Sequence, residues 1–123
     1  RRNSVLAALE RMRGGDASVN LTQVLAYLYI CENEGLSVSE LALLLRTTTA
    51  TASRTVASLG EGDPGTQLGL VAALVNEKHA QGRRLTLTAK GRRLREEIDR
   101  LISEAAPIAL PEAGGLQKRS TRK

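Results

Sequence analysis

Apolar residues recur every three or four positions in several segments of the chain, a spacing typical of helices that bury one face. Gly14 and Gly15 stop the first of these segments, Gly35 stands at the end of the second, and Pro107 ends the last. The pattern predicts helices over residues 4–13, about 22–35, 38–45, 49–59 and 89–106.

Three polar residues stand where helices are predicted to begin. Ser37 and Glu40 form a capping box, in which the hydroxyl and the carboxylate each accept a free backbone N–H. Thr48 and Thr88 can cap the fourth and fifth helices with their hydroxyls. These caps predict that the third helix is short and that only a tight turn separates it from the fourth.

The segment RTTTATASRTVASL, residues 46–59, is unusual in its hydroxyl content. Alone it fits a strand or a linker, because threonine is β-branched and hydroxyls compete for backbone hydrogen bonds. After a capped helix, however, the spacing of Ala52, Val56 and Leu59 favours a helix. The outward face is then small, hydroxyl-bearing, basic and free of acids, as a helix in a DNA major groove requires; it comprises Ala50, Thr51, Ser53, Arg54, Ala57 and Ser58.

Two strands are predicted after the fourth helix. A loop rich in glycine, GEGDPGTQLG, is followed by an apolar strand over residues 68–75, a turn over 76–82 and a returning strand over 83–88. Two short helices followed by a hairpin make a winged helix-turn-helix. The predicted fold class is therefore mainly α with a small β-hairpin.

Length and charge narrow the function. A chain of 123 residues fits one domain, predicted over residues 1–106, with a mobile basic tail over 107–123. Its net charge is +5, and residues 83–95 hold six cations and no acid. This distribution favours a polyanionic partner. The longest apolar run covers residues 24–31, too short for a bilayer. Only five apolar residues follow Arg1-Arg2, too few for a signal peptide, so we expect a cytoplasmic protein.

Other chemistries find little support. GEGDPGT lacks the lysine of a phosphate-binding loop. Cys31 is either an oxidant sensor or a buried inert thiol, and its acidic neighbours favour the inert thiol. With His79 as the single histidine, no metal site and no catalytic set can be assembled. We expect no enzyme activity and no cofactor.

The residues SELALLLRTTTATASRTVASL, then GLV, then GRRLTLTAKGRRL resemble the multiple-antibiotic-resistance regulator (MarR) family of transcription factors. The resemblance covers about residues 21–101. It implies a homodimer that binds a pseudo-palindromic duplex, usually as a repressor, with a small-molecule effector as a further partner. The sequence departs from the family in having Arg46 where glycine is common, an insertion over residues 62–67, and no Asp-x-Arg pair at the wing tip, where His79 and Gln81 stand.

These observations predict a sequence-specific regulator that binds double-stranded DNA. Its DNA contacts are expected from Thr48, Thr49, Ala50, Thr51, Ser53 and Arg54 in the fourth helix and from His79, Arg83 and Arg84 in the wing. Its dimer contacts are expected from the first and last helices, through Val5, Leu9, Leu94, Ile98, Leu101 and Ile102. The alternative is a winged helix that binds another protein and not DNA.

Overall fold

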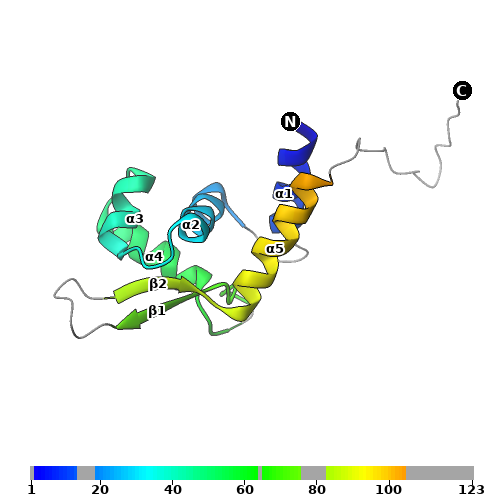
Figure 1. Cartoon of the computed structure of the whole chain (residues 1–123). Helices are drawn as coiled ribbons and strands as arrows, with labels where there is room; N and C mark the ends of the chain where they lie inside the picture. The colour runs from blue at the N-terminus through cyan, green and yellow to red at the C-terminus, as the bar shows by residue number, and fades with distance from the viewer. Residues whose placement is uncertain (1, 14–18, 64, 76–82, 105–123) are drawn as a thin grey trace, which may run out of the picture.

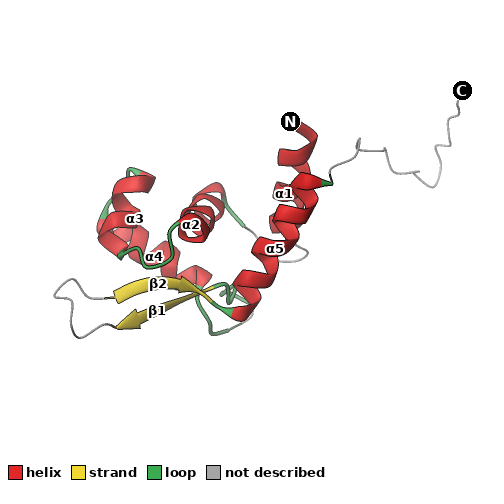
Figure 2. Ribbon diagram, viewed as in Figure 1, coloured by secondary structure: helices red, strands yellow, loops and turns green. Residues whose placement is uncertain are grey.

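The computed structural model describes residues 2–13, 19–63, 65–75 and 83–104. Within them the elements follow in the order α1 (Arg2–Arg13), α2 (Leu21–Glu32), α3 (Val38–Leu45), α4 (Thr49–Leu59), β1 (Val71–Val75), β2 (Arg83–Leu87) and α5 (Ala89–Ser103). Helices and a single hairpin in this order (Figure 2) confirm the predicted fold class. The proposed tail lies outside the described residues.

The elements form two groups joined by the core (Figure 1). Helices α1 and α5 pack side by side, whereas α2, α3 and α4 form a cluster from which the hairpin projects on the side away from α1. Strands β1 and β2 pair antiparallel, with Val71 opposite Leu87. On its other edge, β2 bonds to the segment before α3. The amide of Gly35 donates to the carbonyl of Leu85 at 2.7 Å, and the amide of Leu85 donates to the carbonyl of Leu36 at 2.7 Å.

The predicted helix caps are confirmed. Ser37 accepts the Glu40 amide at 3.1 Å, and Glu40 accepts the Ser37 amide at 2.9 Å. The hydroxyls of Thr48 and Thr88 accept the amides three positions on, at 3.1 and 3.0 Å. Asn20 starts α2 with a capping box that the sequence analysis did not single out. Each of the helices α2 to α5 therefore begins where a side chain satisfies a free backbone N–H.

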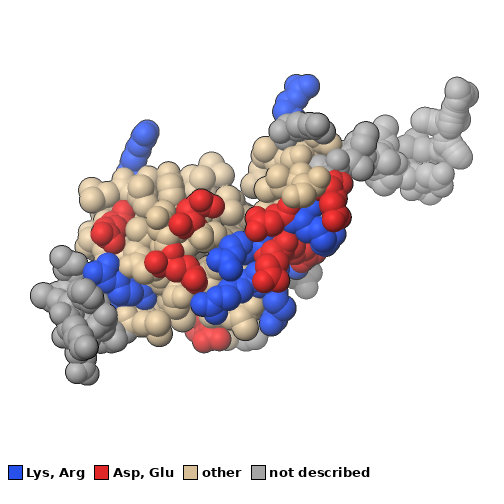
Figure 3. All heavy atoms as spheres, viewed as in Figure 1, with Lys and Arg blue, Asp and Glu red and all other residues tan. Residues whose placement is uncertain are grey.

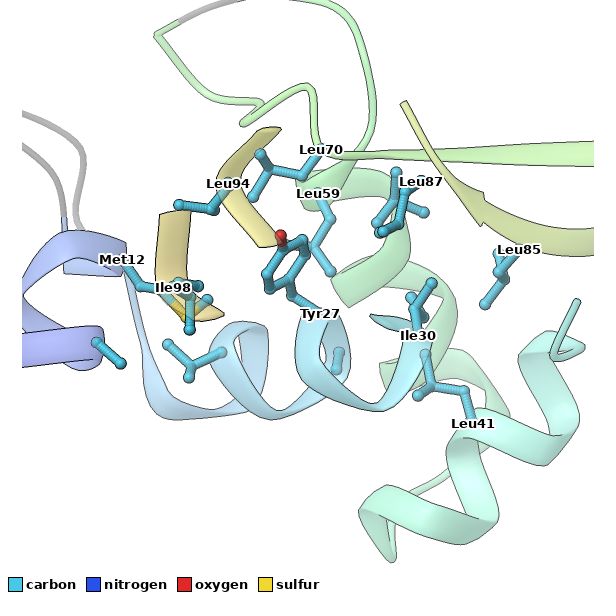
Figure 4. Close-up of a cluster of buried hydrophobic side chains, with 14 residues drawn as sticks. Met12, Tyr27, Ile30, Leu41, Leu59, Leu70, Leu85, Leu87, Leu94 and Ile98 are labelled. Atoms are coloured by element: carbon cyan, nitrogen blue, oxygen red, sulfur yellow. The ribbon is translucent and has the colours of Figure 1, made fainter. Parts of the chain in front are cut away.

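The core lies between α2, α4, the hairpin and α5, with Tyr27 at its centre (Figure 4). Tyr27 is fully buried, and its hydroxyl donates to the carbonyl of Gly91 in α5 at 2.6 Å. Burial raises the pKa of Tyr27 far above its ordinary value, so the hydroxyl keeps the proton that this bond requires. Leu59 and Leu85, at 1% and 0% exposed, pack into the same cluster.

The packing of α5 corrects one expectation from the sequence. Leu94 and Ile98 are only 8% and 4% exposed and belong to the chain's own core, together with Ala8 and Met12 of α1. They offer no surface to a second chain in this arrangement, because α1 covers them. Ile102 is 49% exposed, in contrast.

The face of α1 that packs on α5 also differs from the predicted stripe. Ser4 is buried, and its hydroxyl donates to the carbonyl of Ile102 at 3.4 Å. Val5, Leu6 and Leu9 are instead 55%, 45% and 40% exposed and form an apolar surface on the other side of α1. The exposed apolar surface of this part of the molecule is thus on α1.

The insertion after α4 folds back onto the end of that helix. The amide side chain of Gln67 donates to the carbonyl of Ala57 at 2.9 Å and accepts the amide of Asp63 at 3.0 Å. The amide of Leu68 then donates to the carbonyl of Ser58 at 3.0 Å. Carbonyls at a helix end have no partner within the helix. The insertion therefore supplies the C-terminal cap of α4.

Candidate nucleic-acid interface

Helix α4 has a buried side and an exposed side, as its spacing predicts. Ala52 and Leu59 are 0% and 1% exposed and face the core. The other side, called here the exposed face of α4, consists of Thr49, Ala50, Ser53, Arg54 and Ala57. No acid occurs in this helix. The surface is thus small, polar and positively charged.

Two hydroxyls of α4 serve the helix itself. Thr55 donates to the carbonyl of Thr51 at 3.0 Å, and Ser58 donates to the carbonyl of Thr55 at 2.6 Å. Ser58 also accepts the amide side chain of Gln23 at 3.0 Å and is half-buried. The expectation that Ser58 faces outward was wrong, because Gln23 of α2 packs over it.

Three side chains in the first turns of α4 form a hydrogen-bonded series. The hydroxyl of Thr48, which caps the helix, donates to the hydroxyl of Thr51 at 3.1 Å. The guanidinium of Arg54 donates to the same Thr51 oxygen at 3.2 Å. The series holds Arg54 against its own helix, which reduces the conformational entropy that it loses on binding a ligand.

The turn between α3 and α4 keeps a left-handed residue although it lacks glycine. Arg46 has φ 58° and ψ 48°. Its amide donates to the carbonyl of Leu43 at 3.2 Å, and the amide of Thr47 donates to the carbonyl of Ala42 at 3.0 Å. This is the bonding pattern with which helices commonly end. The departure at Arg46 therefore leaves the turn intact.

A shallow groove of about 410 Å³ lies between α4 and the hairpin. Ser53 and Ala57 line it from α4, and Ala73 and Arg83 line it from the strands. The groove also contains Glu61, which follows α4. The structure thus brings the exposed face of α4 and the wing arginine Arg83 onto one continuous surface.

The two predicted wing arginines have different surroundings. Arg83 is exposed. Arg84 is half-buried, donates to the carbonyl of Gly35 at 3.0 Å and lies 3.6 Å from Glu40. Successive residues of a strand point to opposite faces, so the pair does not act as one unit. His79, the third predicted wing residue, lies outside the described residues.

The base of the wing is fixed by Glu34. Its carboxylate accepts the amide of Leu87 and the hydroxyl of Thr86, both at 2.9 Å, and it lies 3.4 Å from the guanidinium of Arg92. The hydrogen bond from the Leu87 backbone is the main cause that lowers the pKa of Glu34, because it favours the charged carboxylate. The end of α2 therefore ties β2 to α5.

The charges of α5 differ from those of α4. Acidic and basic side chains alternate along α5 (Figure 3), and Arg11, Arg92 and Arg100 lie in ion pairs that involve or contact this helix. Most of the predicted basic segment over residues 83–95 is therefore balanced by nearby acids. The unbalanced positive surface lies on α4 and on Arg83.

Other candidate chemistry is limited in the part of the chain that the structure describes. Burial is the main cause that raises the pKa of the Cys31 thiol, which favours the inert form over the reactive thiolate. Among the described residues, no cluster of His, Cys, Asp and Glu could hold a metal ion. None of the described helices combines the length and the apolar character that a bilayer span requires.

Helix α3, the turn at Arg46 and α4 form a helix-turn-helix, and the adjoining hairpin makes it a winged helix. Comparison with solved structures supports this class. A MarR-like transcriptional regulator from Thermotoga maritima is 26% identical, with a TM-score of 0.59, over 69% of this chain and 56% of that chain. A MarR-family regulator from Silicibacter pomeroyi is 27% identical, with a TM-score of 0.55, over 68% and 52%.

The present chain is a MarR-like winged-helix protein. It spans little more than half the length of these two regulators. A third structure, the MepR–DNA complex of S. aureus, has the same fold at 19% identity, with a TM-score of 0.62, over 84% of this chain and 76% of that chain. No protein-family model and no curated protein matches the chain significantly.

Proposed function

We propose that the chain is a transcriptional regulator that binds double-stranded DNA through the exposed face of α4. The observation that carries the proposal is the juxtaposition of this acid-free face with Arg83 across one groove. The solved MepR–DNA complex, which shares the fold, supports it. The protein acts by binding and not by catalysis, in the cytoplasm, where a bacterial chromosome lies.

The dimensions of α4 suit a major groove. B-DNA admits an α-helix there only if its outward side chains leave room for the base edges. Ala50 and Ser53 are small, so the backbone of α4 can come close to the bases. Arg54 then reaches a guanine edge or an adjacent phosphate, and the hydroxyls of Thr49 and Thr51 meet base edges. Arg83 contacts the phosphate backbone from the wing.

The regulator acts as a homodimer on a pseudo-palindromic operator, usually as a repressor. The apolar surface of Val5, Leu6 and Leu9 on α1, together with Ile102 at the end of α5, supports this proposal, because these residues are exposed although they are apolar. A two-fold axis through this surface would present two copies of α4 to successive major grooves.

The test begins with selection of duplexes from a random pool by the purified protein. Binding of the selected duplex and of a scrambled one is then compared for wild type, Arg54→Ala and Arg83→Ala. Arg54→Ala should lose about 1–3 kcal/mol of discrimination between the two duplexes, the usual value of a base contact. Arg83→Ala should weaken both duplexes alike, because phosphates carry no sequence information.

Two results would contradict the proposal. If the wild-type protein binds no duplex at low salt, the winged helix serves another partner, such as a protein. If Arg54→Ala keeps full discrimination while Arg83→Ala loses it, α4 is not the element that reads sequence.

A further inference from the structure

Arg46 holds a backbone conformation that side chains rarely adopt. Its φ of 58° is the one positive value at a non-glycine position among the described residues. The left-handed region brings Cβ close to the following carbonyl oxygen, so glycine is the residue that fits there without cost. An arginine at this position therefore requires a reason outside the turn itself.

The side chain of Arg46 has no structural task in the described part of the chain. It is exposed, and no described residue accepts a hydrogen bond from its guanidinium or pairs with its charge. Arg84 and Arg92, by contrast, are tied to carbonyls or carboxylates of neighbouring elements. The guanidinium of Arg46 is thus available to a ligand.

The surroundings of Arg46 indicate an anionic ligand. No acid occurs from residue 41 to residue 60, and the next cation along this stretch is Arg54 on the exposed face of α4. Arg46 lies three residues before the start of α4. A residue in this turn borders the helix that enters the groove, and arginines at such a border meet phosphate oxygens and not base edges.

We propose that Arg46 is a phosphate contact that flanks α4 and adds affinity without sequence preference. The inference rests on the proposed DNA binding and extends it to a residue that replaces glycine in the turn. It separates two properties that normally change together. The arginine destabilises the turn and strengthens binding, so its removal should have opposite effects on stability and on affinity.

The experiment compares Arg46→Gly, Arg46→Asn and Arg46→Lys with the wild type. Arg46→Gly should raise the urea midpoint, because it relieves the left-handed strain. It should also weaken binding to selected and scrambled duplexes alike, by about eightfold at 0.1 M salt, the counterion-release contribution of one phosphate. Arg46→Asn, which tolerates the same φ, should weaken binding equally, whereas Arg46→Lys should retain most of it.

Arg93→Gln serves as the control for net charge, because Arg93 is exposed on α5, which packs against α1 and β2. It should change binding much less than Arg46→Gly does. If wild type binds duplex DNA and Arg46→Gly binds as well, the inference is wrong while the proposed function stands. If wild type binds no duplex, the proposed function itself fails. A loss confined to the selected duplex would also overturn the inference, since it would make Arg46 a reader of sequence.

Discussion

The substitution Gly91→Ala tests how closely α5 packs on the start of the hairpin. A Cβ at Gly91 would lie 2.1 Å from the backbone carbonyl oxygen of Leu70 and 3.3 Å from Cβ of Leu87. Alanine gains about 1 kcal/mol over glycine in a helix interior. Against this, overpacking costs about 1–3 kcal/mol. Displacement of α5 also disturbs the bond from Tyr27 to the Gly91 carbonyl, worth about 1 kcal/mol. We expect a net loss of about 1–3 kcal/mol.

Urea denaturation followed by circular dichroism measures this loss, which should lower the midpoint by roughly 1 M at a typical slope. Gly60→Ala is the matched control, because its Cβ would lie 3.4 Å from the Ala57 carbonyl oxygen, close to an ordinary contact. The control should change stability by less than about 0.5 kcal/mol. A Gly91→Ala protein as stable as wild type would refute the packing argument.

Two further predictions concern the wing anchor and the dimer. Glu34→Gln should cost about 1 kcal/mol at neutral pH, and Glu96→Gln, on an exposed residue without a hydrogen bond or ion pair among the described residues, should cost nothing measurable. Since the pKa of Glu34 is lowered from 4.5, its contribution is present above that value and lost as pH falls through the lowered one. A difference that persists at low pH would exclude this cause. Val5→Asp with Leu9→Asp should give monomers in sedimentation, whereas Leu43→Asp on α3 should not; a wild type already monomeric at tens of micromolar, on the order of usual assay concentrations, would contradict the dimer.

The sequence predicted the elements well because their signals are local. Caps at Ser37, Thr48 and Thr88 act within one helical turn, and apolar spacing marks which side of a helix is buried. The same spacing does not say what covers the buried side. Leu94 and Ile98 were therefore expected at a dimer interface, although α1 of the same chain covers them.

The errors within the candidate site have a similar origin. Ser58 was placed on the exposed face of α4, because spacing alone could not show that Gln23 of α2 packs over it. Strand alternation could have separated Arg83 from Arg84, since neighbouring residues of a strand face opposite sides. The left-handed backbone of Arg46 has no signal in apolar spacing, because it depends on how α3 and α4 meet.

The salt dependence of duplex binding by the wild-type protein tests the central claim most directly. Fluorescence anisotropy with a labelled duplex, repeated across a salt series, gives the slope of log affinity against log salt. If the dimer neutralises about six phosphates, the slope should be near −5, with tighter binding to the selected duplex at every salt concentration. No detectable binding at low salt, or an affinity that does not change with salt, would contradict the account.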